Sequence, residues 1–262
     1  MTAPEPAPVP EPASFGFIIT RNINNHIDTN YWRECVRCIR KYYKEEKIIV
    51  IDDNSSLKTD IDKETKEFYN IEIVLSDYLG AGEVLGYYYG WKYRPFKKFA
   101  VMHDSMFLQN KLPESEPIKF LWHFDTYLGQ GIDGKNDRNV TFINLCDQQK
   151  QEQLFNLYFN KNEWVGCFGV SSLITLECVD VLFSQYNFLN CIKNVKVRSD
   201  REAMERIFGL IVLLENPLLK KNPSLFGNIL TDYPNAYAIK WHHYCHGFRN
   251  DTIAVNKIWS GR

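Results

Sequence analysis

Apolar and polar positions alternate along residues 15–108 in blocks that predict strands and helices in turn. Short apolar runs rich in β-branched residues predict buried strands at 14–20, 47–52, 71–76 and 98–103. Between these runs, helical spacing of apolar positions predicts helices over 30–43, 61–69 and 82–93. Strands that alternate with helices form βαβ units with right-handed crossovers and parallel strands. The pattern therefore predicts an α/β fold with a mostly parallel central sheet flanked by helices.

The pattern is less regular in the second part of the chain. Glycine and aspartate mark turns at 128–137, and a polar stretch with helical spacing predicts a helix over 147–161. The clearest helix covers 199–215, where Ser199 and Glu202 form a capping-box pattern ahead of an apolar stripe. We expect these elements to join the first part in one compact unit.

A second helix is predicted within 163–186, a segment that reads as a strand turning into a helix. Ser171 or Ser172 precedes the helical pattern and is a suitable residue type for its N-cap. The sequence therefore predicts that one of these two serines begins the helix.

Composition sets limits on the class of protein. Alternating prolines favour polyproline II over residues 1–14, which predicts a disordered tail ahead of one domain at 15–262. The chain has 31 basic and 32 acidic residues and a net charge of −1, so we expect no nucleic-acid partner. We find neither a signal-peptide pattern nor an apolar run of the roughly 18 residues that span a bilayer, so we expect a cytoplasmic protein without an integral membrane segment. Seven scattered cysteines are typical of reduced thiols, and nothing in the pattern indicates an oligomeric state.

Polar residues gather where the predicted strands end. The second strand runs into Asp52 and Asp53, the third is followed by a turn from Gly80 to Gly82, and the fourth ends at His103, Asp104 and Ser105. Carboxyl ends of parallel strands meet at one edge of the sheet, where open α/β sheets bind ligands. A single aspartate at a strand end is often only a turn cap. Three such groups at the same edge favour a binding site.

This arrangement resembles that of the nucleotide-sugar glycosyltransferases of the GT-A fold, a Rossmann-like α/β domain. The match runs from about Phe15 to the C-terminus and is closest to small members from large DNA viruses. The resemblance implies transfer of a sugar from a nucleotide-sugar donor, UDP- or GDP-linked, to a glycan or another hydroxyl acceptor. It assigns residues 15–108 to nucleotide binding and residues 109–262 to acceptor binding.

The resemblance also implies donor-binding roles in three segments. The end of the first strand and the IDDNS segment would hold the nucleoside through Thr20, Arg21, Asp52 and Asp53. The glycine-containing turn beside the donor corresponds to Gly80, Gly82 and Glu83. The short Asp-x-Asp motif of the family, which holds Mn²⁺ or Mg²⁺ against the diphosphate, falls on His103, Asp104 and Ser105.

The metal motif departs from the family pattern, because Asp104 is its only acidic residue. Mn²⁺ accepts imidazole as well as carboxylate, whereas Mg²⁺ prefers oxygen, so His103 and Asp104 favour Mn²⁺. Many metal-dependent members use a C-terminal histidine as a further ligand, and the KWHHYCH segment offers His246 for that place. The alternative readings are a turn cap for Asp104 and a surface or core position for the histidine.

An inverting enzyme needs a carboxylate that takes the proton of the acceptor hydroxyl, and its leaving diphosphate needs positive charge. Family members that invert place this base near the start of a helix in the corresponding part of the chain, which points to Asp200 or Glu205. Arg198 and Arg201 are candidates for diphosphate or acceptor contacts. The alternative is an ordinary solvated helix, since Arg201 and Glu205 have the i,i+4 spacing of a surface ion pair. We expect transfer with inversion of configuration at the anomeric carbon.

The GCFGVSSLIT segment resembles the strand and turn beneath the acceptor sugar. It places Gly166 at the acceptor, with Trp164 and Phe168 as aromatic faces for stacking and Arg201 as a further contact. Core packing is the alternative for each aromatic residue.

Three rival functions share parts of this pattern. A dinucleotide-binding oxidoreductase is disfavoured, because no G-x-G-x-x-G follows the first strand. A sugar nucleotidyltransferase would need a glycine-rich basic loop there, and only Arg21 is present. A catalytically inactive, glycosyltransferase-like protein that binds a glycan or a nucleotide sugar stays open, because the acidic motif is incomplete.

Overall fold

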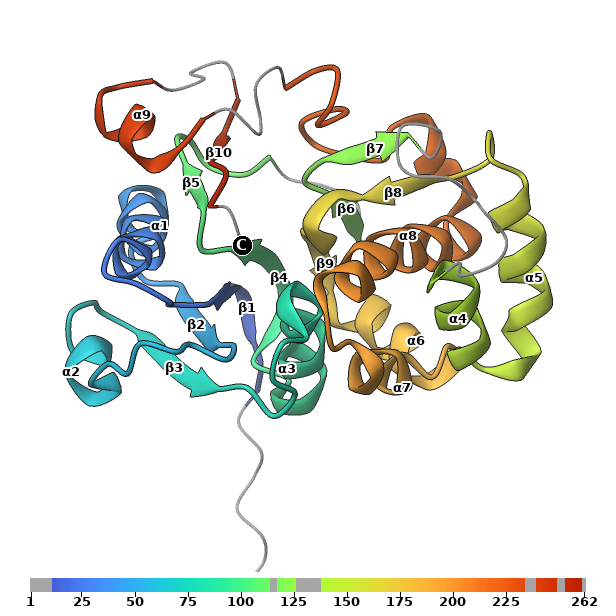
Figure 1. Cartoon of the computed structure of the whole chain (residues 1–262), viewed down its shortest axis with the longest axis horizontal. Coiled ribbons are helices and arrows are strands. Elements are labelled where there is room, and N and C mark those ends of the chain that lie inside the picture. Colours follow the sequence, from blue (N-terminus) through green and yellow to red (C-terminus); the bar gives the residue numbers. More distant parts are fainter. Residues whose placement is uncertain (1–10, 114–116, 126–137, 234–238, 249–252, 261–262) are drawn as a thin grey trace, which may run out of the picture.

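A computed structural model describes residues 11–113, 117–125, 138–233, 239–248 and 253–260 (Figure 1). Its central sheet has six strands in the order β3-β2-β1-β4-β9-β6. Neighbouring strands among β3, β2, β1 and β4 are parallel, and β9 runs antiparallel between β4 and β6. The predicted α/β fold with a mostly parallel sheet flanked by helices is therefore confirmed.

The first part of the chain follows the predicted order of elements. Its elements are β1 (Ala13–Arg21), α1 (Asp28–Tyr42), β2 (Lys47–Asp52), α2 (Ile61–Thr65), β3 (Ile71–Leu75), η1 (Gly82–Val84), α3 (Leu85–Tyr93) and β4 (Phe96–His103). Helix α2 is shorter than predicted and begins at an Asp60 cap, whose carboxylate accepts from the Lys63 amide at 3.1 Å. Of the expected tail, residues 1–10 lie outside the described residues, and β1 begins at Ala13.

The second part is built from shorter pieces. Its strands are β5 (Met106–Leu108), β6 (Ile118–Phe120), β7 (His123–Asp125), β8 (Val165–Cys167), β9 (Ser172–Thr175) and β10 (Val255–Lys257). Its helices are α4 (Arg138–Leu145), α5 (Gln148–Phe159), η3 (Phe168–Val170), α6 (Leu176–Gln185), α7 (Phe188–Asn194), α8 (Arg198–Glu215), η4 (Pro217–Lys221) and α9 (Trp241–Cys245). The turns expected at 128–137 fall outside the described residues.

Two predicted helix caps are wrong. Helix α6 begins after Thr175, whose hydroxyl accepts from the Cys178 amide at 3.5 Å, because Ser172 already belongs to β9. Helix α8 begins one residue earlier than predicted, after Val197. There the Asp200 carboxylate reaches back to the Val197 amide at 3.0 Å and takes the capping place expected for Ser199 and Glu202.

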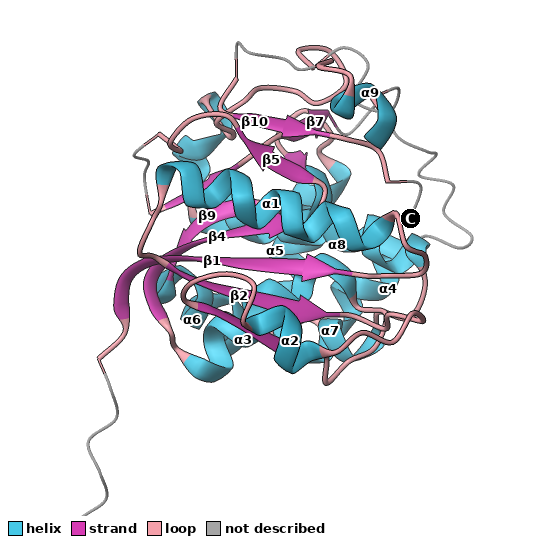
Figure 2. Cartoon of the chain, turned by 90° about the vertical axis from the view of Figure 1, so that its left-hand side faces the viewer, coloured by secondary structure: helices cyan, strands magenta, loops and turns pink. Residues whose placement is uncertain are grey.

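The core lies on both faces of the sheet, because successive strand residues point to opposite sides. Ile18 of β1 packs in one apolar cluster with residues of α3 and α6, whereas Phe17 and Ile19 pack in another with residues of α1. Figure 2 shows α1 above the strands and α3 below them. The parallel strands are therefore buried on both sides, as their continuous apolar runs predicted.

The carboxyl ends of the parallel strands point to one side of the molecule. Strands β1 and β2 run to the right in Figure 2, which is the side that faces the viewer in Figure 1. The loops there are joined by backbone hydrogen bonds, from Asp53 to the Arg21 carbonyl at 2.9 Å and from Asp104 to the Thr20 carbonyl at 3.1 Å. The segments that follow β1, β2 and β4 are thus adjacent.

All seven cysteines are free thiols, in agreement with the predicted reduced state. Within the part of the chain that the structure describes, we find no helix that combines the length and apolar character needed to cross a bilayer.

Candidate active site

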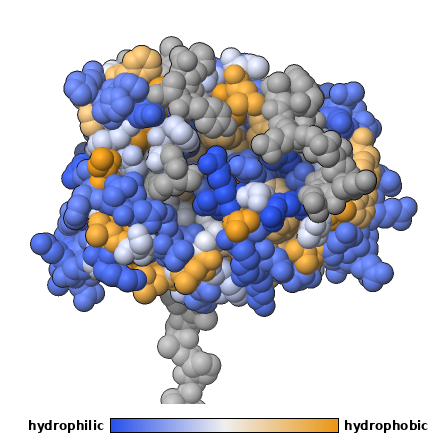
Figure 3. All heavy atoms as spheres, in the orientation of Figure 1, coloured by the Kyte–Doolittle hydropathy of each residue, from blue (hydrophilic) through white to orange (hydrophobic). Residues whose placement is uncertain are grey.

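A pocket of about 360 Å³ opens where the carboxyl ends of β1 and β4 meet α8 and β10. Strongly hydrophilic side chains gather at the centre of this face of the molecule (Figure 3). The polar lining residues are Thr20, Arg21, Asn22, Asp53, Glu83, His103, Asp104, Ser105, Arg198, Arg201, Glu202, Glu205, Arg206, Lys257 and Ser260. The other lining residues are Gly82, Phe124, Phe168, Gly169, Ile229, Leu230 and Trp259.

Asp53 holds the glycine turn against the sheet. One carboxylate oxygen accepts from the Gly80 amide at 2.7 Å and the other accepts from the Gly82 amide at 2.7 Å. Burial raises the pKa of Asp53 in spite of these two hydrogen bonds. The residue therefore shapes the edge of the pocket through the turn as well as lining it directly.

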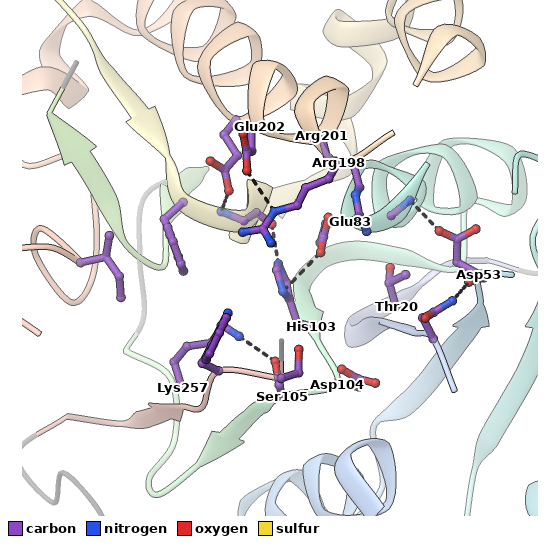
Figure 4. A pocket seen from close by; sticks show the side chains of 18 of the residues that line it. Thr20, Asp53, Glu83, His103, Asp104, Ser105, Arg198, Arg201, Glu202 and Lys257 are labelled. Carbon is purple, nitrogen blue, oxygen red and sulfur yellow. Dashed lines mark hydrogen bonds and ion pairs between the residues drawn. The ribbon is translucent and has the colours of Figure 1, made fainter. Parts of the chain in front are cut away.

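Gly82 lets the Arg201 side chain pass close to the turn. Its φ of +67° is in the left-handed region, and a Cβ there would lie 2.5 Å from Cδ of Arg201. A larger residue at this position would displace Arg201, which approaches the pocket from α8 (Figure 4).

Glu83 and His103 face each other in the pocket, with 3.4 Å between Oε1 of the glutamate and Nδ1 of the imidazole. Burial lowers the pKa of His103, Lys257 adds to the lowering, and Glu83 opposes it. Burial alone would raise the pKa of Glu83, but its interactions with His103, Arg201 and Lys257 together lower it. Glu83 is therefore ionised at neutral pH.

Gly169 joins two side chains of the pocket through its own backbone. Its amide donates to Oε1 of Glu205 at 2.6 Å, and its carbonyl lies 2.7 Å from Nε2 of His103. Because a carbonyl oxygen only accepts, Nε2 of His103 carries a proton. The φ of Gly169 is +58°, and a Cβ there would lie 2.4 Å from Nε2 of His103, so only glycine fits this link.

The carboxyl group of Glu205 has a strongly raised pKa. Burial raises its pKa to about 8, while the Gly169 amide and the charge of Arg206 pull in the opposite direction. A carboxyl group with this pKa exchanges its proton near neutral pH, which suits a general base.

Cations enter the pocket from α8 and β10. Arg198 is exposed and pairs with Glu202 at 3.0 Å, and Arg206 lies 5.0 Å from the centre of the Phe124 ring. Lys257 of β10 is buried, and its Nζ donates to the Ser105 hydroxyl at 2.7 Å. In Figure 4 the α8 side chains and Lys257 come from opposite sides, with His103 between them.

The residues present do not fit a divalent metal centre. Among the described ranges no three His, Cys, Asp or Glu side chains lie close enough to hold a metal ion. The two ring nitrogens of His103 face Gly169 and Glu83, and the Lys257 ammonium contacts Ser105, the neighbour of Asp104. A lysine beside the one acidic residue of the motif repels a cation, so we derive no step through a metal.

Two predicted nucleoside residues form a buried ion pair at the end of the first two strands. Nε of Arg21 lies 2.8 Å from Asp52, and Nη1 lies 2.9 Å from Glu64. The Arg21 guanidinium also stacks on Trp32 at 4.9 Å. Asp52 is buried and does not line the pocket. The Arg21 guanidinium is therefore held by other residues of the protein, which indicates a role in stability.

The structure brings together most of the predicted donor residues but separates the others. Thr20, Asp53, Gly82, Glu83, His103, Asp104 and Ser105 share the pocket with Phe168, Arg201 and Glu205. Gly80 and Asp200 lie outside the lining, the former on the Asp53 turn and the latter in an ion pair with Arg138.

The remaining predicted residues also lie away from this pocket. Trp164 is buried, with its indole N–H on the Tyr158 carbonyl at 3.1 Å, and Gly166 packs against the Phe124 ring. His246 is exposed at the end of α9, with its Nδ1 2.6 Å from the His242 carbonyl.

Sequence reasoning missed Lys257, Arg206 and Phe124. Lys257 lies in a three-residue strand and pairs with Met106 of β5, far earlier in the chain, and no local pattern indicates such a pairing. Arg206 could have been found, since it follows Glu202 at i,i+4 spacing on α8 and both residues line the pocket.

Comparisons with known proteins add structures with a similar layout. No protein-family model and no curated protein matches the sequence. Residues 1–349 of TarS from S. aureus match with a TM-score of 0.40 and 12% identity over 73% of this chain, which spans 54% of that structure. The galactosyltransferase LgtC, in complex with donor and acceptor sugar analogues, matches with a TM-score of 0.39 and 10% identity over 74% of this chain and 70% of its own.

Two further structures show the same kind of likeness. An active-site mutant of LgtC matches with a TM-score of 0.44 and 9% identity over 92% of this chain and 86% of its own. The bifunctional glycosyltransferase WbbM matches with a TM-score of 0.40 and 13% identity over 77% of this chain and 38% of its own. The narrower likeness to viral members stays a prediction. At these identities and TM-scores the matches say nothing about activity, and we argue the function of this chain from the pocket.

Proposed function

We propose that this chain is a glycosyltransferase that moves a sugar from a nucleoside-diphosphate donor to a hydroxyl acceptor with inversion. The observation that carries the proposal is that the carboxyl group of Glu205, held by the Gly169 amide, lines the same pocket as several side-chain cations. Displacement at an anomeric carbon needs both a base for the acceptor and positive charge for the leaving diphosphate.

The donor nucleotide occupies the sheet edge in this proposal. Thr20, Asn22 and Asp53 supply hydroxyl, amide and carboxylate groups at the ends of β1 and β2. Ligands of open α/β sheets bind at this edge, and the pocket volume is within the range of small-molecule sites. A UDP- or GDP-linked sugar would place its phosphates toward Arg201 and Lys257.

The transfer is a single displacement. The acceptor oxygen forms a bond to the anomeric carbon while the bond from that carbon to the phosphate oxygen breaks. The electron pair of the broken bond leaves with the nucleoside diphosphate, whose added charge the α8 arginines and Lys257 stabilise. The Glu205 carboxylate takes the proton of the acceptor hydroxyl, so its deprotonated form is the reactive one.

The acceptor packs against the apolar groups of the pocket in this proposal. The apolar lining residues are Phe124, Phe168, Ile229, Leu230 and Trp259. Sugar rings stack on aromatic faces, so this wall suits a glycan acceptor. Trp164 and Gly166 would support this wall from behind, since Gly166 packs against Phe124.

The test is calorimetric titration of a panel of UDP- and GDP-sugars, followed by an assay of nucleoside-diphosphate release with glycan acceptors. We expect one donor class to bind and its sugar to be transferred. Glu205→Gln should keep donor binding and lose transfer, because the amide keeps the shape of the carboxyl group but cannot take a proton.

Two results would contradict the proposal. Binding of a nucleotide sugar without release to water or any acceptor would support the inactive binding protein. Release of pyrophosphate from a nucleoside triphosphate and a sugar phosphate would support a sugar nucleotidyltransferase.

A further inference from the structure

Lys257 lies deeper in the protein than lysines usually do. The residue is 7% exposed, and its Nζ donates to the Ser105 hydroxyl at 2.7 Å and to the Ile258 carbonyl at 2.8 Å. Lysine is almost never this buried unless its charge is used or compensated. The residue also lines the pocket, so a ligand bound there would lie beside it.

The backbone around Lys257 is fixed on both sides. Strand β10 pairs antiparallel with β5, which places Lys257 opposite Met106, the residue after Ser105. The Lys257 amide also donates to the Tyr233 hydroxyl at 3.1 Å. The ammonium group is therefore held at the end of β4, at the segment that would carry the metal in related enzymes.

Lys257 lines the same pocket as the charged and titratable groups at its centre. Glu83, His103 and Asp104 share this lining with the lysine. Figure 4 shows Lys257 beside Ser105, with His103 and Asp104 close by. A divalent cation placed beside Asp104 would meet this charge at short range.

We propose that Lys257 replaces a divalent cation in this enzyme, so that donor binding and sugar transfer need no metal. This inference rests on the proposed function and specifies how that function is carried out. The Lys257 ammonium, together with Arg201, neutralises the diphosphate of the donor. When the bond from the anomeric carbon breaks, the phosphate oxygen keeps the electron pair and these two cations stabilise it.

The first test measures how UDP and GDP bind to the wild-type chain in EDTA, in Mn²⁺ and in Mg²⁺. We expect the dissociation constant of the bound nucleotide to agree within about twofold in all three conditions. A divalent cation that completes the site would instead tighten binding by more than about tenfold, and that result would overturn the inference.

The second test compares Lys257→Met with Lys119→Met. Lys119 is a matched control, since it is also a buried strand lysine whose Nζ donates to a backbone carbonyl, that of Asn222, and it does not line the pocket. Lys257→Met should weaken the binding of the nucleoside diphosphate at least about tenfold, because a buried charge contact is lost. Lys119→Met should leave this affinity unchanged, and Lys257→Arg should restore part of it.

Uridine and guanosine serve as probes that lack phosphate. Lys257→Met should change their affinity by less than about twofold, which separates a phosphate contact from a general disturbance of the pocket. Equal losses for nucleoside and nucleoside diphosphate would refute the inference, as would unchanged binding of the diphosphate.

These results can be told apart from a failure of the proposed function. If the wild-type chain binds a nucleoside diphosphate only with Mn²⁺ and still transfers sugar, the glycosyltransferase proposal stands and the role of Lys257 is rejected. If the wild-type chain binds no nucleotide in any condition, both proposals are rejected. The wild-type comparison of metal conditions decides the inference even if Lys257→Met does not fold.

Discussion

The two parts of the chain contribute opposite charges to the pocket. Residues 15–108 supply the carboxylates Asp53, Glu83 and Asp104, and their one lining arginine, Arg21, is bound in a buried ion pair. Residues 109–262 supply the lining cations Arg198, Arg201, Arg206 and Lys257, together with the carboxyl groups of Glu202 and Glu205. The first part is built on long parallel strands, whereas the second part brings its charged side chains to the pocket on one helix, α8, and one short strand, β10.

If the chain transfers sugar as proposed, this difference separates binding of the nucleotide from chemistry at the sugar. A parallel sheet presents fixed loop ends, which suits recognition of a rigid base and ribose. Charge that stabilises a leaving group must come from the opposite side of the ligand, which α8 and β10 supply here. Substitutions in the second part should therefore affect turnover and phosphate binding, and substitutions in the first part should affect stability and shape.

The largest expected effect is on turnover in Glu205→Gln. Because general-base catalysis contributes about 10²–10⁴-fold, we expect kcat to fall by about 10³-fold. Donor affinity should stay within about threefold of the wild type. Asp200→Asn is the contrasting variant, since Asp200 caps α8 and does not line the pocket. Loss of turnover in Asp200→Asn with full activity in Glu205→Gln would show that the base is misassigned.

Arg21→Met should be the most destabilising change in the first part. It removes a fully buried guanidinium and leaves Asp52 and Glu64 without that partner, which typically costs about 3–5 kcal/mol. Urea unfolding measures the change. Arg94→Met is the control, because the exposed Arg94–Asp180 pair should contribute about 1 kcal/mol or less. Similar losses in the two variants would contradict the structural role of Arg21.

The raised pKa of Glu205 predicts a dependence of stability on pH. The pKa of Glu205 is about 8 in the folded chain, whereas the ordinary value of a glutamate, taken for the unfolded chain, is 4.5. Between these two pH values the folded state therefore binds more protons than the unfolded state. This contribution to stability is complete below pH 4.5 and is lost as the pH rises through about 8. Glu205→Gln should therefore be more stable than the wild type at pH 8.5, by on the order of 2 kcal/mol.

Measurements of unfolding free energy at pH 5 and pH 8.5 test this dependence. The stability difference between Glu205→Gln and the wild type should be larger at the higher pH. A difference that is independent of pH would mean that Glu205 is ionised throughout.

Gly82→Ala should disturb the contact between the glycine turn and Arg201 of α8 without unfolding the chain. The new Cβ would displace Arg201, and we expect donor affinity to fall about fivefold, the equivalent of about 1 kcal/mol. Gly247→Ala is a matched control, because Gly247 also has a positive φ, +86°, but no atom lies within 4 Å of a Cβ there. Titration calorimetry should find a loss of affinity only in Gly82→Ala.

His246→Ala should have the smallest effect. The side chain is exposed on α9 and does not line the pocket, so donor affinity should stay within about twofold of the wild type with or without Mn²⁺. If His246→Ala lowered donor affinity only in the presence of Mn²⁺, His246 would be a metal ligand. That result would argue against the proposal that Lys257 takes the place of the metal.

The fold of the first part could be predicted because its signals are local. The strand runs of β1, β2 and β4 are long and apolar, and the helices between them have clear spacing. The second part uses three-residue strands such as β8 and β10, which are too short to show a period. Their positions depend on pairing with distant residues, and a single sequence does not display that pairing.

The site divides in the same way. Asp53 and Asp104 could be found because they follow predicted strands, and parallel strands end at one edge. Glu205 was one of two alternatives, and its contact with the Gly169 amide across 36 positions distinguishes it from Asp200. Lys257 carries no local signal, because its role arises only when β10 pairs beside Ser105.

The backbone of Gly169 has a consequence for how this protein can evolve. One residue orients Glu205 through its amide and His103 through its carbonyl, and no other residue type fits its conformation. We therefore expect any substitution at position 169 to disturb Glu205 and His103 at the same time. If the chain transfers sugars as proposed, a change of sugar specificity would begin elsewhere, for example at the apolar lining residues Phe124, Ile229 and Leu230.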